Sequence, residues 1–153
     1  MATLRTRCAI AEARRRGIRD DLLRELTIAA LSACEGSSAL TLDRFLEASG
    51  PLCDLSAEYM EILASGGLAK PLGGEAYELG AEQKVELAAM AISLGASPER
   101  ACRLLSWAEF ESVVEMALGA NGYATARHYV VKGAGRSRCE IDVLGATESV
   151  VVA

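Results

Sequence analysis

The chain has 153 residues and a formal net charge of −5 at pH 7, a length that suits one domain or two small packed ones. It contains no run of 18 or more apolar residues, so we expect no membrane span. Charge breaks its first apolar run too early for a signal peptide, and we expect a cytoplasmic protein. Five cysteines without a Cys-x-x-Cys pair, and a single histidine, argue against a zinc site of standard spacing.

Charge is unevenly distributed along the chain. Residues 1–24 carry seven arginines against three acids, residues 25–120 carry five basic residues against fifteen acids, and residues 121–153 carry four against three. An acidic middle between two basic ends argues against nucleic acid covering the whole surface, but it allows DNA to contact the ends. The candidate DNA-binding residues are Arg14, Arg15, Arg16, Arg136 and Arg138. A solvated helix face explains Arg14, Arg15 and Arg16 better than DNA contact does, and a solvated hairpin tip explains Arg136 and Arg138 equally well.

After a basic N-terminal segment, residues 1–20, the pattern of residues 21–80 predicts three helices and then a hairpin. Asp20 or Asp21 caps the first helix, Thr41 and Ser56 open the next two, and Gly73-Gly74 joins two short strands. This order resembles a winged helix-turn-helix domain. The phrase Tyr-Met-Glu-Ile-Leu-Ala-Ser-Gly-Gly-Leu-Ala-Lys, residues 59–70, is similar to the end of the third helix and the wing of that family.

The resemblance to a winged helix implies a third helix that enters the major groove of DNA, where basic and amide side chains read bases. Here that segment carries Asp54, Glu58 and Glu61, and no basic residue precedes Lys70. Carboxylates repel phosphate, which favours a packing or dimerising module over a base reader. A homodimer is one form that such a module would take.

Residues 81–105 are predicted to be a helical connector, because apolar residues recur at helical spacing and Ser97-Pro98 begins a second helix. Ser106 and Glu109 then have the spacing of a capping box, which opens a helix that ends at Asn121-Gly122. Three short strands follow, over residues 123–131, 139–144 and 149–152. We therefore predict an α+β chain, with a winged-helix-like helical part packed on a helix and a three-stranded meander.

Two acids stand out in this last part. Alternation along the second strand places Cys139, Ile141 and Val143 on one face and Glu140 and Asp142 on the other. Aspartate is disfavoured inside an apolar strand and needs a reason to be there. Carboxylate oxygens are the ligands that Mg²⁺ prefers, usually one or two from the protein.

These residues resemble a known family. Phe110-Glu111 on a helix, Gly122-Tyr123, a strand, a turn with basic residues, and Glu-Ile-Asp-Val over residues 140–143 are similar to the PD-(D/E)XK nucleases. The branch that they resemble holds methyl-directed restriction endonucleases and archaeal Holliday junction resolvases. For residues 106–153, the resemblance implies Mg²⁺-dependent cleavage of DNA. It implies that Glu111 is the catalytic helix acid and that Asp142 is the catalytic, metal-binding aspartate.

The chain departs from that family in one respect. The family carries an acid-x-Lys pair on the next strand, whereas the only acid after Asp142 is Glu148 and no lysine follows Lys132. We therefore expect a partial nuclease core that ends about where the third element should begin. Lys132 is an alternative source of the lysine.

Other interpretations of the same residues stay open. Glu111 in the first turn of a helix would also complement the helix dipole. His128 is interpreted as structural, although a nucleophilic Cys139–His128 pair is conceivable. Three functions follow, namely a nuclease, a regulatory winged-helix DNA-binding protein, and a protein-interaction module that neither binds nor cuts DNA.

Overall fold

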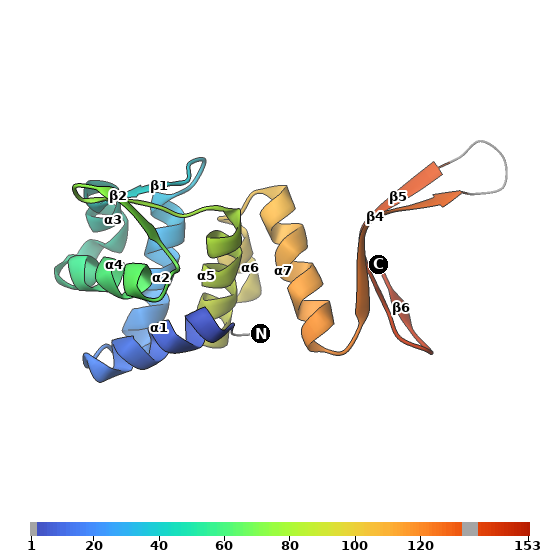
Figure 1. The fold of residues 1–153 in the computed structure, drawn as a ribbon, viewed down its shortest axis with the longest axis horizontal. Helices are drawn as coiled ribbons and strands as arrows, with labels where there is room; N and C mark the ends of the chain where they lie inside the picture. Colours follow the sequence, from blue (N-terminus) through green and yellow to red (C-terminus); the bar gives the residue numbers. More distant parts are fainter. Residues whose placement is uncertain (1–2, 133–137) are drawn as a thin grey trace.

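The computed structural model describes residues 3–132 and 138–153, which form helices and two small antiparallel sheets (Figure 1). The helices are α1 (Leu4–Arg15), α2 (Asp20–Ala33), α3 (Leu42–Ser49), the 3-10 helix η1 (Gly50–Leu55), α4 (Ser56–Ser65), α5 (Ala81–Ser93), α6 (Pro98–Cys102) and α7 (Trp107–Ala120). The strands are β1 (Ala39–Thr41), β2 (Lys70–Gly73), β3 (Ala76–Glu78), β4 (Ala124–Lys132), β5 (Arg138–Ala146) and β6 (Val151–Val152).

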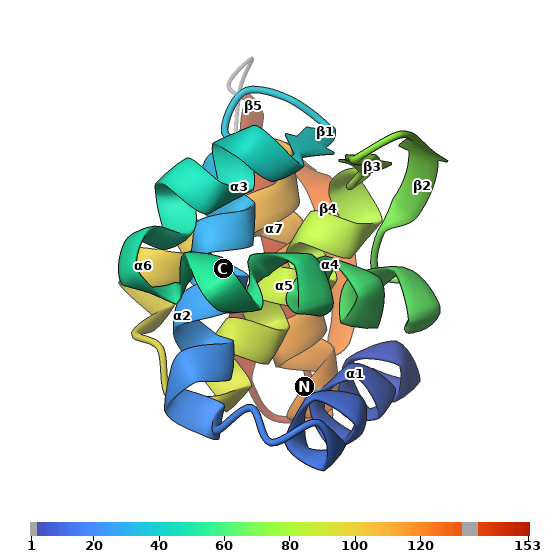
Figure 2. The same ribbon diagram turned by 90° about the vertical axis from the view of Figure 1, so that its left-hand side faces the viewer.

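The helices before α7 enclose the main core. Figure 2 shows α3 and α4 in front of α2 and α5, with α7 behind them. Leu23, Leu26 and Leu63 are fully buried between these layers, and α5 is buried from Lys84 to Ala91. Tyr59 is also inaccessible to solvent, and its hydroxyl forms a hydrogen bond of 2.8 Å with the Thr27 hydroxyl. Removal of these apolar side chains from water provides most of the driving force for this part of the fold.

The first sheet has the strand order β1-β3-β2 and covers one end of the helical part. The β2–β3 hairpin lies at the predicted Gly73-Gly74 turn, where both glycines have positive φ. Strand β1 was not predicted. It has only three residues, immediately before helix α3, and Leu40 is the one that is buried. The pairing of β1 with β3 makes a three-stranded sheet where the sequence predicted only the hairpin.

Helix α7 joins the helical part to the second sheet (Figure 1). It begins with the predicted capping box, in which the Ser106 amide donates to Glu109 at 2.7 Å and the Glu109 amide donates to Ser106. The Glu109 carboxylate also lies 3.6 Å from the ammonium of Lys84 on α5, and both side chains are buried. Lys84 donates in turn to the carbonyl of Cys34 at the end of α2. These contacts fix the first turn of α7 against the helical part.

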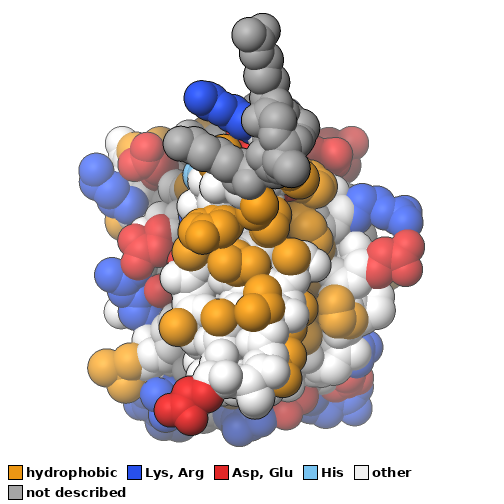
Figure 3. Space-filling model, turned by 90° about the vertical axis from the view of Figure 1, so that its right-hand side faces the viewer, with side chains coloured by type: hydrophobic (Ala, Val, Ile, Leu, Met, Phe, Trp, Pro, Cys, Tyr) orange, Lys and Arg blue, Asp and Glu red, His pale blue; other side chains and the backbone are white. Residues whose placement is uncertain are grey.

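The second sheet has the strand order β4-β5-β6 and packs one face on α7. Gly145 lies so close to Leu118 of α7 that a Cβ atom there would be 3.0 Å from its methyl carbon. Val143 is buried on the same face. The opposite face carries apolar side chains in solvent (Figure 3), with Val151 67% exposed.

The mixture of helix and antiparallel sheet confirms the α+β class. The finer domain boundaries at residues 20, 80 and 105 and the family-level architectures stay predictions. The three predicted C-terminal strands are present, although β6 is shorter than residues 149–152. No helix within residues 3–132 and 138–153 has the length and apolar character needed to cross a bilayer.

A candidate metal centre on the β4–β5 hairpin

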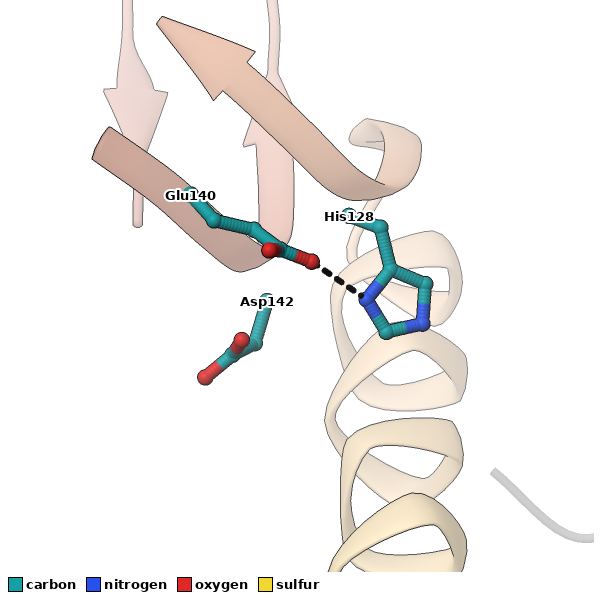
Figure 4. A group of neighbouring side chains, drawn as sticks. All are labelled: His128, Glu140 and Asp142. Atoms are coloured by element: carbon teal, nitrogen blue, oxygen red, sulfur yellow. Dashed lines mark hydrogen bonds and ion pairs between the residues drawn. The ribbon is translucent and has the colours of Figure 1, made fainter. Parts of the chain in front are cut away.

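Three potential metal ligands meet on the β4–β5 hairpin (Figure 4). His128, Glu140 and Asp142 each offer a ligand atom, and these atoms lie within 4.8 Å of one another. Nδ1 of His128 is 3.1 Å from Oε1 of Glu140, and all three residues are exposed. No interaction of the Asp142 carboxylate with another described side chain reaches hydrogen-bond or ion-pair distance. Its oxygen atoms are therefore open to solvent and to a cation.

Strand register explains why these residues meet. Arg127 pairs with Val143 and Tyr129 pairs with Ile141, which places His128 directly opposite Asp142. The ladder is interrupted at that point, because His128 has a φ of 52° and is the non-glycine residue with positive φ in the described part of the chain. Such a conformation is uncommon for residues other than glycine and costs free energy, although asparagine, aspartate and histidine adopt it more often than the rest. The irregularity turns the imidazole toward α7, where Nε2 lies 3.9 Å from Oε2 of Glu111.

Glu111 is buried and already has a partner. It is 4% exposed, and its Oε2 accepts a hydrogen bond of 2.9 Å from the Arg127 guanidinium. It lies beyond the first turn of α7, whose first-turn acid is Glu109, so the interpretation of Glu111 as a complement to the helix dipole is wrong. The structure thus places His128 near both predicted acids, 3.9 Å from Glu111 of α7 and in one cluster with Asp142. The Glu111 carboxylate is already paired with the Arg127 guanidinium.

Arg127 is the centre of a polar network that sequence reasoning missed. Its guanidinium donates to Ser112 at 3.2 Å and to the carbonyl of Ala108 at 3.3 Å, besides its contact with Glu111. Its Nε atom is buried without a hydrogen-bond partner among the described residues. A cleft of about 630 Å³ between α5 and α7 has Arg127 in its lining, together with Glu82, Glu109 and Glu115. The carboxylates in that lining disfavour an anionic ligand in the cleft.

The predicted DNA-binding arginines of α1 are engaged in ion pairs. Arg14 donates to Asp20 at 2.9 and 2.7 Å, Arg15 pairs with Glu12, and Arg16 contacts Glu12 at 2.7 Å. Arg16 also lies 3.2 Å from Glu61 and 3.8 Å from Glu58 of α4. Helix α1 belongs to the helical part, at the side of the molecule away from the hairpin (Figure 1). The role of Arg14, Arg15 and Arg16 in DNA binding stays a prediction, and these ion pairs neutralise much of the charge of the three arginines.

The remaining predicted residues lie near the hairpin tip. Arg138 begins β5, is exposed, and by alternation shares its strand face with Glu140 and Asp142. Arg136 lies outside the described residues, as does the side chain of Lys132. The thiol of Cys139 donates weakly to the Glu140 carbonyl at 3.8 Å, while His128 uses Nδ1 toward the Glu140 carboxylate. These contacts lend no support to a nucleophilic Cys139–His128 pair.

The structure groups Asp142 with two residues that the sequence had left in minor roles. His128 was interpreted as structural, and Glu140 was placed on the strand face of Asp142 without a role of its own. The β4–β5 register places His128 opposite Asp142, and Glu140 lies on the same strand face as Asp142. Knowledge of that register would have been enough to group the three residues. Compared with known proteins, the chain matches no family model, no curated protein and no solved structure. The site therefore has to be interpreted from its own chemistry.

Proposed function

We propose that the chain carries part of a Mg²⁺-dependent DNA endonuclease centre of the PD-(D/E)XK type, with Asp142 as metal ligand and Glu111 as the helix acid. The observation that carries the proposal is the meeting of Asp142, Glu140 and His128 on the hairpin, 3.9 Å from the Glu111 carboxylate at its nearest contact. A Mg²⁺ ion bound there would polarise a phosphodiester and lower the pKa of bound water.

The donor set fits Mg²⁺ through Asp142 and Glu140, whose exposed carboxylate oxygens leave most of the coordination sphere to water and phosphate. Glu111 fits only as a second-sphere residue in the described state, because Arg127 holds it at 2.9 Å. In that role it orients His128 and Arg127 rather than binding the ion. Direct ligation by Glu111 requires Arg127 to move away, for example onto a phosphate.

Arg138 is the described residue best placed to contact DNA near this centre. Its position on the same strand face as Asp142 would bring a phosphate-binding cation within a few residues of the metal ligand. Arg136 on the adjoining turn belongs to the same proposal. The arginines of α1 add less, because each pairs with an acid.

The acid–lysine pair of the family has a natural place in this sheet. Val152 of β6 pairs with Gly145 and Val151 with Ala146, so β6 runs along β5 toward Asp142. Because paired residues advance in opposite directions along antiparallel strands, a strand that carried this register onward would come to lie beside Asp142. We propose that cleavage needs an acid–lysine pair at that position, from a longer chain or from a partner subunit.

The test is DNA binding and cleavage by the chain, measured with linear and four-way-junction duplexes in Mg²⁺ or EDTA. Mg²⁺ should strengthen binding, Asp142→Asn should remove that increase, and the chain alone should leave both duplexes uncut. Asp54→Asn is the matched control, because Asp54 is exposed on η1 in the helical part. DNA binding that is insensitive to Mg²⁺, or a Mg²⁺ effect that survives Asp142→Asn, would overturn the proposal. Cleavage abolished by Asp142→Asn would keep the centre but refute the need for an added acid–lysine pair.

A second candidate function is a non-catalytic winged-helix regulator. It is supported by the element order α2, β1, α3, α4, β2, β3 and by the β1-β3-β2 sheet, in which β1 completes the hairpin predicted as a wing. Glu58 and Glu61 of α4 lie near Arg16, which favours contact with protein over contact with bases. This alternative predicts partner binding that is indifferent to Mg²⁺ and to Asp142→Asn.

A further inference from the structure

We infer that His128 is the third ligand of the hairpin centre, with Asp142 and Glu140, and that the centre therefore prefers Mn²⁺ and related first-row transition ions over Mg²⁺. The inference rests on the metal site of the proposed function, but not on its nuclease activity. Neither the nuclease resemblance nor the residue pattern assigned this role to the histidine.

The position of the His128 ring suits metal ligation. The His128 imidazole lies between the exposed carboxylate of Glu140, 3.1 Å from Nδ1, and the buried carboxylate of Glu111, 3.9 Å from Nε2. A histidine that ligates a metal through one nitrogen commonly presents the other to a carboxylate, which fixes the ring and its tautomer. Glu111, held rigid by Arg127, is placed to serve as that outer carboxylate.

The donor set also bears on the choice of ion. Mg²⁺ takes oxygen ligands and dehydrates reluctantly, whereas imidazole suits softer divalent ions. One imidazole and two carboxylates, with ligand atoms within 4.8 Å of one another, are close enough for a single ion to bridge after small side-chain rotations. The imidazole is therefore the donor that separates Mn²⁺ from Mg²⁺ at this site.

The backbone at His128 is consistent with this role. His128 has a φ of 52°, a left-handed conformation that histidine adopts more readily than most residues but that departs from the extended backbone of a strand. The conformation turns the His128 ring toward Glu111 at a point where β4 and β5 would otherwise continue their ladder. The His128 ring therefore reaches this position only because the pairing of β4 with β5 is interrupted there. Metal ligation gives a reason for that arrangement.

The experiment uses MnCl₂ and the intact chain with any affinity tag removed. His128 is the only histidine, so spin-echo modulation of bound Mn²⁺ by a directly coordinated imidazole nitrogen can come from no other imidazole of the chain. We expect that modulation in the wild type and its loss in His128→Asn. Asparagine tolerates the left-handed conformation, which keeps the hairpin intact. Affinity for Mn²⁺ should fall roughly tenfold in His128→Asn while affinity for Mg²⁺ changes less than about twofold.

Two further variants keep the outcomes distinct. Glu148→Gln removes an exposed acid of the turn between β5 and β6, outside the cluster, and should change nothing. Asp142→Asn should weaken both ions and, if it does not, the proposed function fails together with the inference. Mn²⁺ that binds through Asp142 without nitrogen modulation, or a His128→Asn variant that keeps its preference for Mn²⁺, would overturn the role of His128 and leave the proposed function standing.

Discussion

The helical part, residues 4–102, and the hairpin part, residues 107–152, are held together in different ways. Fully buried leucines, together with Phe45 and Tyr59, form one apolar cluster in the helical part. Within the described residues, that cluster reaches Val113 of α7 but includes nothing from β4, β5 or β6. The hairpin is held instead by α7, by a buried arginine–glutamate pair and by strand pairing. The candidate site lies entirely in this less buried region.

The difference implies that stability and chemistry can be changed separately. Loops and sheet edges on a rigid scaffold are where binding residues concentrate, because their side chains are free of packing duties. Asp142, Glu140 and His128 are all exposed, so replacing them removes little packing. The following variants, from the largest expected effect to the smallest, test this separation.

Leu63→Ala should give the largest loss of stability. Leu63 is fully buried on α4, and truncating a buried leucine typically costs about 2–5 kcal/mol, from lost transfer free energy and the cavity left behind. Urea unfolding followed by far-ultraviolet circular dichroism measures the change. Val151→Ala on the exposed sheet face is the matched control and should cost less than about 0.5 kcal/mol. Equal losses for the two variants would contradict the proposed division.

Arg127→Ala should be the most damaging single change in the hairpin part. It leaves the buried Glu111 carboxylate without its partner, and we expect a cost of about 2 kcal/mol, below that of a fully buried pair because Arg127 is 30% exposed on its side chain. In Glu111→Gln/Arg127→Ala the loss should be smaller, because no unpaired charge remains. A double variant that is less stable than Arg127→Ala would show that the pair has another role.

Ser106→Ala tests the boundary between the two regions. It removes the hydroxyl that accepts from the Glu109 amide in the capping box, which should cost about 1 kcal/mol. Ser65→Ala serves as control, since that hydroxyl is not a cap and donates to the Ile62 carbonyl within α4. Native-state hydrogen exchange should locate the Ser106→Ala effect in the first turn of α7. An effect confined to β4 and β5 would be inconsistent with this position.

Glu86 on α5 gives a small effect that depends on pH. Burial raises the pKa of the Glu86 carboxyl, and Arg5, 3.6 Å away, only partly opposes this. A carboxyl with a raised folded-state pKa binds its proton more tightly when folded, so its contribution is complete below the unfolded pKa and is lost as pH rises through the folded value. Glu86→Gln should therefore gain stability relative to the wild type as pH rises from acid to neutral. A constant difference between the two proteins across that range would contradict the assignment.

Much of the fold follows from local sequence. Caps at Ser97 and Ser106 and the glycine turn at Gly73-Gly74 lie where predicted, because capping and turn formation depend on a few neighbouring residues. The face of β5 that packs on α7 also agrees with alternation, since Val143 is buried and Asp142 is exposed. Strand β1 could not be predicted, because three residues become a strand only through their pairing with β3, which is distant in sequence.

The candidate site was predictable only in part, for the same reason. Asp142 is unusual within its own strand, and that local oddity identified it. The partners of Asp142 depend on the register between β4 and β5 and on the irregular backbone at His128, which no short pattern specifies. The pairing of Glu111 with Arg127 depends on how the sheet lies on α7, which no local pattern of the sequence specifies.

The central claim is that the β4–β5 hairpin carries a divalent-metal site built around Asp142. Calorimetric titration of the wild type, Asp142→Asn and Asp54→Asn with Mn²⁺ tests it most directly. One ion should bind to the wild type and to Asp54→Asn with equal affinity, and binding to Asp142→Asn should be at least roughly tenfold weaker although its unfolding midpoint in urea without metal is unchanged. Equal binding by all three proteins, or binding by none of them, would contradict the claim.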